Sequence, residues 1–405
     1  MSAAGALALS ARVRRIKPSP SMVARDHARH LQAQGRDIID LTAGEPDFDT
    51  PKHIHAAVAA ALEAGETRYT PVNGTPALRK AIIAKLEREN GVRYAVDQIS
   101  VGGGAKQVIY NALAATIGEG DEVVIPAPYW VSYPDMVLAC DGTPVIIPCG
   151  ENAGFKLAAE ALEQAITPRT RWVILNSPCN PTGAFYSAGE MRTLTEVLLR
   201  HPQVALMTDD IYEHIRFDGS EPVCPVAVEP TLGDRTLLVN GVSKTYAMTG
   251  FRIGYGAGPQ GLIAAMNTIQ SQSTSCVCSV SQAAATAALN GDQSFVADSR
   301  AAYRARRDRA VALLNAIPGL TCRTPDGAFY VYPSCAGLIG KTTPDGRILS
   351  TDFDVVLYFL DTAGVAMVDG TAYGLSPYLR LSIAIALPAI EEACARLARA
   401  CAALT

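Results

Sequence analysis

The sequence predicts an α/β protein in which a mostly parallel sheet lies between helical layers, followed by a smaller α+β part. Of its 405 residues, 49% are hydrophobic and 18% are charged, which supports a large core and excludes a disordered chain. Between residue 51 and about residue 258, short apolar runs alternate with amphipathic stretches. This alternation is typical of strands and helices that follow one another along the chain. After about residue 290 the pattern changes.

Six short runs rich in Val, Ile and Leu are predicted to be strands, namely residues 122–126, 144–148, 172–176, 204–208, 236–240 and 252–256. Their continuous apolar character suits strands that are buried on both faces of a parallel sheet. Amphipathic stretches between them predict helices at residues 76–89, 106–117 and 187–200.

The C-terminal part is predicted to be a small α+β unit. Its expected elements are a long helix at 294–316, a strand at 328–332, a helix at 352–362, strands at 365–368 and 379–383, and a last helix at 389–402. The first 50 residues are polar and interrupted by prolines, so we expect them to pack onto this part. The predicted division is therefore a large domain of residues 51–293 and a small domain of residues 294–405 that includes residues 1–50.

Charge argues against a nucleic-acid-binding protein. The chain has 35 Lys and Arg against 39 Asp and Glu, a formal net charge of −4. Its one dense basic run is interpreted as the solvated face of a helix, and consists of Arg304, Arg306, Arg307 and Arg309.

The chain is predicted to be cytoplasmic and to have no membrane span. No apolar run approaches the roughly 18 residues that a transmembrane helix needs. The apolar stretch Ala3 to Leu9 precedes the cations Arg12, Arg14 and Arg15, which is the reverse of a signal peptide. The ten cysteines show no zinc spacing, so we expect reduced thiols, mostly in the core, and no metal.

Two glycine-containing turns follow the pattern of a ligand site at the ends of parallel strands. Val101-Gly-Gly-Gly-Ala-Lys106 opens a predicted helix, where small residues and free N–H groups favour an anion. It is neither a Rossmann fingerprint nor a Walker loop. Asn176-Ser-Pro-Cys-Asn-Pro-Thr-Gly183 directly follows a predicted strand and presents Asn180 on an irregular backbone.

Two further segments carry ionisable residues at strand ends. Asp209 ends one apolar run and Tyr212 follows three residues later, which is also consistent with a simple helix cap. Lys244 ends another apolar run, and Arg252 lies eight residues beyond it. A buried lysine is costly unless it is paired or used covalently, and a desolvated amine suits Schiff-base chemistry.

Taken together and in order, these motifs resemble the fold-type I, pyridoxal-phosphate-dependent aminotransferases of class I. The similarity runs from about Arg15 to the C-terminus and also covers Leu41-Thr-Ala-Gly-Glu-Pro-Asp-Phe48, Ala127-Pro-Tyr-Trp-Val-Ser-Tyr-Pro134 and Gly327-Ala-Phe-Tyr-Val-Tyr-Pro333. Within the class, the chain is similar to bacterial aspartate and bifunctional aspartate/prephenate aminotransferases. The resemblance implies a seven-stranded sheet, a homodimer and a ping-pong reaction with pyridoxal 5′-phosphate.

The resemblance also implies roles around the cofactor ring. Lys244 would hold the cofactor as a Schiff base and move the substrate Cα proton. Asp209 would pair with the pyridine nitrogen, Tyr212 and Asn180 would bond the ring oxygen, and Trp130 would stack on the ring.

At the phosphate end, the implied partners are the Arg252 guanidinium and the start of the helix at Gly104, Ala105 and Lys106, with Ser243 beside the lysine. Tyr69 would reach the phosphate of the partner chain across a dimer interface.

Substrate residues follow from the same resemblance. Arg380 would bind the α-carboxylate, because a planar guanidinium suits a carboxylate. Gly44 would close the N-terminal segment over the substrate, while Trp130 and Asn180 also line its site. Lys106 would bind the distal carboxylate of a dicarboxylic substrate. Lys17 and Ser21 match positions that are tied to that carboxylate and to prephenate.

Several departures from close relatives leave the substrate open. Phe251 stands where relatives have a Trp, and residues 271–276 and 380–386 differ from those of close relatives. Asp369-Gly-Thr-Ala-Tyr-Gly374 stands where they have His-Gly-Ser-Ala-Phe-Gly. The leading hypothesis is an aspartate:2-oxoglutarate aminotransferase, and whether it also accepts prephenate is left open. Alternatives are an aromatic, alanine or broad-range aminotransferase, a carbon–sulfur lyase or decarboxylase on the same fold, and a non-catalytic regulator.

Overall fold

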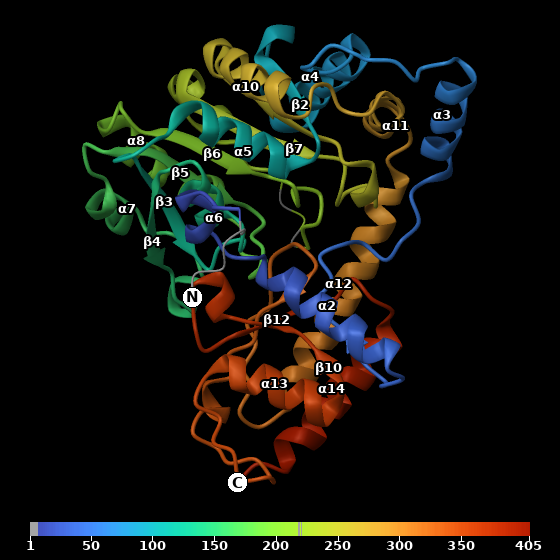
Figure 1. Cartoon of the computed structure of the whole chain (residues 1–405), viewed down its shortest axis with the longest axis vertical. Coiled ribbons are helices and arrows are strands. Elements are labelled where there is room, and N and C mark those ends of the chain that lie inside the picture. The colour runs from blue at the N-terminus through green and yellow to red at the C-terminus, as the bar shows by residue number, and fades with distance from the viewer. Residues whose placement is uncertain (1–6, 218, 220) are drawn as a thin grey trace.

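The computed structural model describes residues 7–217, 219 and 221–405, and its centre is a seven-stranded sheet (Figure 1). The strand order is β2-β8-β7-β6-β5-β3-β4. The strands are β2 (Ile99–Gly102), β3 (Glu122–Ala127), β4 (Thr143–Pro148), β5 (Thr170–Asn176), β6 (Ala205–Asp209), β7 (Thr236–Gly241) and β8 (Gly254–Ala257). β8 runs in the opposite direction to the other six strands, which all run the same way. The predicted mostly parallel sheet is therefore confirmed.

All six strands predicted for this sheet form, and one strand of the sheet was missed. The missed strand, β2, is only four residues long, and its sequence Ile-Ser-Val-Gly lacks a continuous apolar run. The strand predicted to start at residue 252 begins at Gly254 instead. The reason is that Arg252 adopts a φ of 57°, in the left-handed region, which is incompatible with a strand.

Helices cover both faces of the sheet. One face carries α5 (Ala105–Thr116), α6 (Tyr133–Ala139) and α10 (Gln260–Ser273). The other carries α7 (Ala159–Ala165) and α8 (Ala188–Arg200) over its centre. Beside β2 and β8, that face is covered by α3 (Lys52–Glu63), α4 (Pro76–Asn90) and α11 (Ser279–Asn290). Since both faces are buried, neighbouring strand residues such as Val123 and Val124 enter different cores, which explains the continuous apolar runs.

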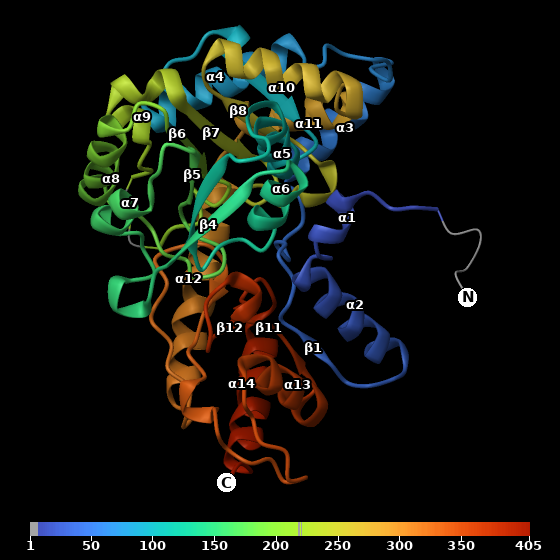
Figure 2. The same ribbon diagram turned by 60° about the vertical axis from the view of Figure 1, so that its left-hand side comes forward.

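The C-terminal part is an α+β arrangement, and its core also takes in Leu41 and apolar residues of the segment 211–217 that follows β6 (Figure 2). The helices are α12 (Ser294–Asn315), α13 (Asp352–Ala363) and α14 (Leu387–Ala402). A small antiparallel sheet has the order β11-β12-β9, formed by β11 (Val368–Asp369), β12 (Leu379–Ser382) and β9 (Tyr330–Val331). The single strand predicted at 365–368 is therefore two short strands, because β10 (Val365–Ala366) pairs elsewhere.

The N-terminal segment contacts both parts of the molecule. Its strand β1 (Ile39–Asp40) pairs in parallel with β10, and α2 (Pro20–Ala33) lies beside it. Before them, α1 (Ala11–Arg15) packs on α6, where Arg12 binds Asp141 at 2.6 Å. The division into residues 51–293 and the remainder stays a prediction. Residues 3–6 of the apolar N-terminal stretch lie outside the described residues.

The interpretation of the basic run in α12 as a solvated face is wrong for two of its members. Arg306 forms an ion pair with Asp47 at 2.7 Å, and the Arg307 side chain donates to the carbonyl of Pro325 at 2.9 Å. The reason is that the N-terminal segment and the 325 loop cover that side of the helix. All ten cysteines are free thiols, eight of them buried. Among the described residues, none of the helices combines the length and apolar character needed to cross a membrane.

One close contact holds β8 against the start of α5. A Cβ atom on Gly254 would lie 2.1 Å from the Ala105 nitrogen and 2.3 Å from the Gly104 carbonyl carbon. Both are backbone atoms, so neither can move aside cheaply. We expect Gly254→Ala to lower the free energy of unfolding by about 1–3 kcal/mol, the usual cost of overpacking. Urea unfolding of the whole chain measures this.

The matched control is Gly261→Ala in α10, where nothing lies within 4 Å of the added methyl group. That variant should change stability by about 0.5 kcal/mol or less, toward stabilisation, because alanine favours a helix over glycine. Equal effects of both substitutions would contradict the contact.

Candidate active site

A cavity of about 250 Å³ lies where β5, β6 and β7 end, between the sheet, helix α2 and the C-terminal part. The predicted site residues that line it are Ser21, Gly44, Ala105, Lys106, Trp130, Asn180, Asp209, Tyr212, Ser243, Lys244, Arg252 and Arg380. They come from stretches that are far apart in the sequence, from Ser21 to Arg380. The cavity therefore brings together most of the residues that the sequence motifs singled out.

Lys244 lies in the turn that follows β7, with its amine inside the cavity. Its Nζ donates a hydrogen bond to the carbonyl of Gly44, and lies 6.0 Å from the ring centres of Tyr212 and Phe329. Burial lowers the pKa of Lys244 to about 8, and the nearby Glu45 carboxylate only partly opposes this. About a tenth of the amine is therefore uncharged at pH 7, far more than for an ordinary lysine, and this neutral form can act as a nucleophile.

Asp209 ends β6 and is buried. The hydroxyl of Tyr133 donates to its Oδ2 at 2.7 Å, and the backbone N–H of Ile211 approaches its Oδ1 at 3.4 Å. Burial raises the pKa of Asp209 to about 6, although the Tyr133 hydrogen bond lowers it. A buried carboxylate with no side-chain cation in direct contact suits a ligand that brings its own positive charge.

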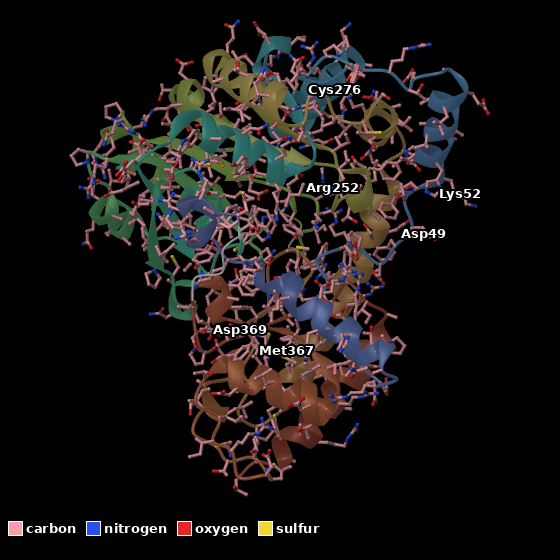
Figure 3. All side chains as sticks on the ribbon, viewed as in Figure 1. Asp49, Lys52, Arg252, Cys276, Met367 and Asp369 are labelled. Carbon is pink, nitrogen blue, oxygen red and sulfur yellow. The ribbon has the colours of Figure 1, made fainter. Side chains whose placement is uncertain are left out.

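The start of α5 forms a cradle next to Arg252, which is labelled in Figure 3. Gly104, with a φ of 92°, caps the helix, and a Cβ there would lie 2.4 Å from the Arg252 Nη2. The guanidinium donates to the carbonyls of Gly103 at 3.1 Å and Thr249 at 3.0 Å. A helix N-terminus combined with a guanidinium is a suitable binding site for a phosphate.

Arg380 reaches the cavity from β12 and is only 2% exposed. Its guanidinium lies 4.7 Å from the Tyr330 ring centre and 5.3 Å from that of Tyr373. It donates to the Thr42 carbonyl and approaches Asn180 Oδ1 at 3.4 Å. Its buried Nε has no partner among the described residues, so donors remain for a carboxylate.

Lys106 lies at another wall of the cavity. Its Nζ is 4.8 Å from the Trp130 ring centre. Burial and, to a lesser extent, the charge of Arg252 lower the pKa of Lys106. On the side of α2, Ser21 Oγ lies 3.2 Å from the Tyr373 hydroxyl. The cavity thus holds cationic side chains from both the sheet and the C-terminal part.

Three predicted site residues do not line the cavity. Gly104 lies against the guanidinium of Arg252, which is itself a lining residue. The backbone N–H of Lys17 donates to Asp135 Oδ1 at 3.1 Å, and its side chain is not in the cavity wall. The Tyr69 side chain is 93% exposed, so within one chain it has no role in the cavity.

Sequence reasoning missed several lining residues, namely Ser19, Met22, Thr42, Val131, Ser132, Asn176, Ile211, Thr249 and Tyr330. Most of them lie inside motifs that were recognised but received no role. Tyr330, whose hydroxyl is 2.8 Å from that of Tyr212, lies 118 residues along the chain from its partner. Only the fold brings such pairs together.

The sequence pattern of the family described as "Aminotransferase class I and II" matches residues 36–397. The chain is a class I/II aminotransferase. The predicted family is thereby confirmed, and the lyase and regulator alternatives are not favoured. Members of class I use pyridoxal phosphate.

Similar aminotransferases cover the whole chain. The "Aspartate/prephenate aminotransferase" of Cereibacter sphaeroides is 55% identical, over 98% of this chain and 99% of its own length. The "Aspartate aminotransferase" of Rhizobium meliloti is 55% identical, over 92% and 91%. A solved aspartate aminotransferase structure from Rhizobium meliloti superimposes with a TM-score of 0.96 at 52% identity, covering 99% of this chain and 100% of that one. The Thermus thermophilus aspartate aminotransferase with maleate gives 0.91 at 39% identity, covering 98% and 100%.

The lowered pKa of Lys244 predicts how the rate would depend on pH if this amine captures pyridoxal phosphate covalently. Only the uncharged amine is nucleophilic, so capture should become faster as pH rises toward about 8 and then level off. Below that value, the rate constant should fall about tenfold for each pH unit. Stopped-flow absorbance of the cofactor-free protein measures it, with Lys106→Ala as the matched lysine control. A rate that does not change between about pH 6 and pH 9 would contradict the role of Lys244.

Proposed function

We propose that this chain uses pyridoxal phosphate to move an amino group between aspartate or glutamate and the oxo acids 2-oxoglutarate or oxaloacetate, with prephenate as a further acceptor. The observation that carries the proposal is the pairing of two cationic side chains, Arg380 and Lys106, in one cavity with the nucleophile Lys244. A dicarboxylic substrate carries two negative charges, so it requires two cations at separate ends of the site.

The residues present fit the cofactor. The cradle of Gly104 and Arg252 suits a phosphate, because a side chain at Gly104 would fill the space next to the guanidinium. Asp209 suits a protonated pyridine nitrogen, Trp130 offers a ring face, and Lys244 offers the amine for covalent attachment. When bound, pyridoxal phosphate supplies an electron sink that stabilises negative charge on the substrate Cα.

Each polar residue of the cavity then has a task. Arg380 binds the α-carboxylate through its unpaired donors and so orients the Cα–H bond. Lys244 would hold the cofactor, and its Nζ is also the group that would take the substrate Cα proton and later return it. Asp209 would keep a positive charge on the ring nitrogen. The Tyr212 hydroxyl, which is paired with that of Tyr330, would donate to the ring oxygen. Aspartate leaves as oxaloacetate, and 2-oxoglutarate then takes up the amino group as glutamate.

The choice of a dicarboxylate rests on Lys106 and on the relatives. Two relatives are named for aspartate, and the Thermus enzyme was solved with maleate, which is itself a dicarboxylate. Lys106 Nζ lies over the Trp130 ring, and Ser19 and Ser21, in the segment around the start of α2, line the same cavity. Lys17 lies at the beginning of that segment, which supports a role near larger acceptors such as prephenate.

The test is a scan of half-reactions with the cofactor-loaded protein. Aspartate, glutamate, phenylalanine, alanine and cysteine are mixed with it in turn, and the absorbance change of the bound cofactor is followed. The amino form is then mixed with 2-oxoglutarate, oxaloacetate and prephenate. Aspartate and glutamate should react fastest. Pyruvate and ammonia from cysteine, without an acceptor, would contradict the proposal.

In the same assay, Lys106→Ala should lower kcat/KM for aspartate by about 10–100-fold, since one charge-assisted contact of about 1.5–3 kcal/mol is lost. The value for alanine should change less than about threefold, because alanine has no distal carboxylate to lose a contact. Lys17→Ala is the matched control for a lysine outside the cavity wall, and should affect prephenate more than aspartate. An equal loss for aspartate and alanine with Lys106→Ala would contradict the assignment.

We further propose that the enzyme is a cytoplasmic homodimer in which Tyr69 of each chain completes the partner's phosphate site. The support is the 93% exposure of a large aromatic side chain whose segment is otherwise held in place. The neighbouring Thr70 N–H donates to Cys276 Sγ at 3.4 Å, and Gln282 Nε2 donates to the Thr70 hydroxyl at 2.9 Å. A fixed segment with a projecting aromatic ring is suited to contact a second chain.

Tyr69→Phe should weaken pyridoxal phosphate binding by about tenfold, the value of one hydrogen bond to a charged group. Sedimentation should show a dimer for both proteins, because the ring itself is retained. Tyr110→Phe, another exposed tyrosine, is the control and should bind the cofactor normally. An unchanged affinity of Tyr69→Phe for pyridoxal phosphate, measured by absorbance titration, would contradict the proposed role of Tyr69 in the partner's site.

A further inference from the structure

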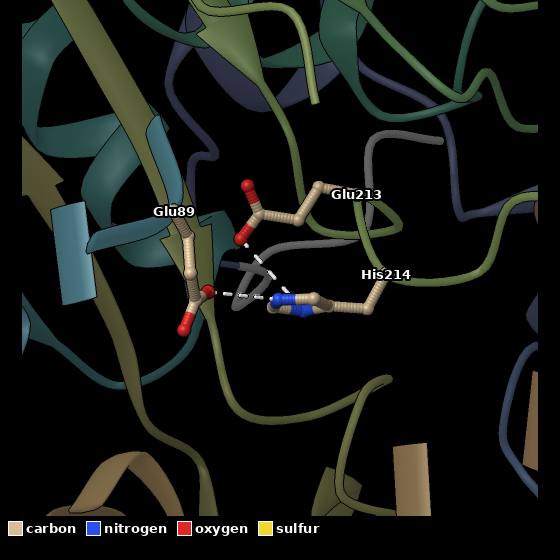
Figure 4. Close-up of side chains that lie close together, drawn as sticks. All are labelled: Glu89, Glu213 and His214. Atoms are coloured by element: carbon tan, nitrogen blue, oxygen red, sulfur yellow. Dashed lines mark hydrogen bonds and ion pairs between the residues drawn. The ribbon is translucent and has the colours of Figure 1, made fainter. Parts of the chain in front are cut away.

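A cluster of four ionisable side chains lies behind the cavity, on residues to which the proposed mechanism gives no task. Lys85 and Glu89 lie on α4, and Glu213 and His214 follow directly after Tyr212. Figure 4 shows Glu89, Glu213 and His214 close together. Lys85 is only 1% exposed. We call these four residues the rear cluster. Its position joins α4 to the loops that carry the cavity residues.

The rear cluster is already charge-paired. Lys85 Nζ donates to the Glu213 carboxylate and to Asn90 Oδ1 at 2.8 Å, and lies 3.5 Å from Glu89. Glu213 also accepts from the side-chain amides of Asn90 at 2.9 Å and Asn240 at 2.7 Å. Because an ammonium group already lies between the two carboxylates, the cluster is unsuited to a metal ion despite its ligand types.

His214 connects this cluster to residues 243–248, which include Lys244 and are called the lysine loop below. Its Nε2 lies 2.9 Å from Glu89 Oε2, and its Nδ1 lies 3.0 Å from the hydroxyl of Thr245. A carboxylate only accepts, so Nε2 is the donor in the first bond. Thr245 is 3% exposed and directly follows Lys244. The imidazole is therefore a rigid link between α4 and the residue next to the nucleophile.

The carboxylates of the cluster remain charged. Burial opposes ionisation of Glu89, but the hydrogen bond from His214 and the charge of Lys85 outweigh it and lower its pKa to about 2. The pKa of Glu213 is lowered against burial by the charge of Lys85. The neighbouring Asp210 has its pKa raised by burial and by the charge of Glu213, so it does not compete for Lys85. The links therefore persist throughout the neutral range.

The lysine loop needs support from behind. On the cavity side, Lys244 makes one hydrogen bond, to Gly44. Three residues later, Ala247 has a φ of 52°, a conformation that a residue with a Cβ adopts only when its surroundings impose it. Thr50 holds the Ala247 carbonyl at 2.7 Å on one side, and the His214–Thr245 bond holds the loop on the other.

We propose that the rear cluster is a positioning device for catalysis, in which His214 fixes the Lys244 amine through Thr245 while Glu213 fixes Tyr212. The inference rests on the proposed function in that Lys244 is the group that moves the Cα proton. Proton transfer requires the amine to lie within a few tenths of an ångström of its optimal position, and this tether supplies that precision. His214 and Glu213 act only through their neighbours, so they are positioning residues.

The first test is hydrogen exchange of the whole chain without cofactor. Thr245→Val keeps the shape of the side chain and removes the hydroxyl. It should speed amide exchange in residues 243–248 by about tenfold or more. Thr245→Ser keeps the hydroxyl and should exchange like the wild type. Thr195→Val, at a threonine that is 1% exposed in α8, controls for the loss of any buried hydroxyl. Unchanged exchange in Thr245→Val would overturn the proposal.

The second test is the half-reaction with aspartate and with Cα-deuterated aspartate. Thr245→Val should lower the maximal rate by about tenfold and leave the half-saturating aspartate concentration within about twofold. The deuterium isotope effect should rise, because proton transfer becomes the slower step. A lower melting temperature with an unchanged isotope effect would mean a purely structural role and would overturn the proposal.

His214→Gln serves as the second variant, with the same criteria, if Thr245→Val does not fold. Failure of the wild-type protein to react with aspartate would refute the proposed substrate. The exchange experiment needs neither cofactor nor substrate. Its result therefore tests the His214–Thr245 link independently of the proposed substrate.

Discussion

The structure depends on keeping one primary amine, that of Lys244, inside a protein interior and in a reactive state. Burial removes the water that would stabilise its positive charge, so its pKa falls to about 8. The same burial removes the solvent that could orient the side chain. The amine must therefore be held by its own backbone, and the backbone by the elements around it. The end of β7, the Gly44 carbonyl and the rear cluster meet this requirement from three sides.

A second consequence of burial is the unequal distribution of charge around the cavity. Arg252, Arg380 and Lys106 are cationic groups in its wall, while the Asp209 carboxylate has, among the described residues, the neutral Tyr133 as its one side-chain hydrogen-bond partner. A cavity with such an excess of positive charge attracts anions, namely a phosphate and carboxylates. Asp209 faces no basic side chain in direct contact, and is therefore free to pair with a cation on a ligand. Behind the sheet, charge is balanced differently, because Lys85 lies between two carboxylates.

The sequence predicted the parts of the structure that depend on local pattern. Strands β3 to β7 were found because continuous apolar runs mark strands that are buried on both faces. β2 was missed because four residues with a serine among them carry too little pattern. The cavity residues followed from motifs, but Tyr330 and Tyr133 received no role, since their partners lie 118 and 76 residues away. The rear cluster was invisible for a similar reason: Lys85 and Glu89 resemble a solvated pair on a helix face, and Glu213 is 128 residues from Lys85.

The two cations that we propose to bind the substrate come from different parts of the molecule. Lys106 belongs to α5 under the sheet, whereas Arg380 belongs to β12 in the C-terminal part. The distance between them, which would select the length of a substrate, is therefore set by how the two parts pack. The N-terminal segment joins both, through the Arg12–Asp141 ion pair on α6 and the pairing of β1 with β10. Between these two anchors, Ser19, Ser21 and Met22 form part of the cavity wall. In the proposed function, the choice of substrate length thus involves the same short stretch of chain, in which Pro20 presets the backbone for the first turn of α2.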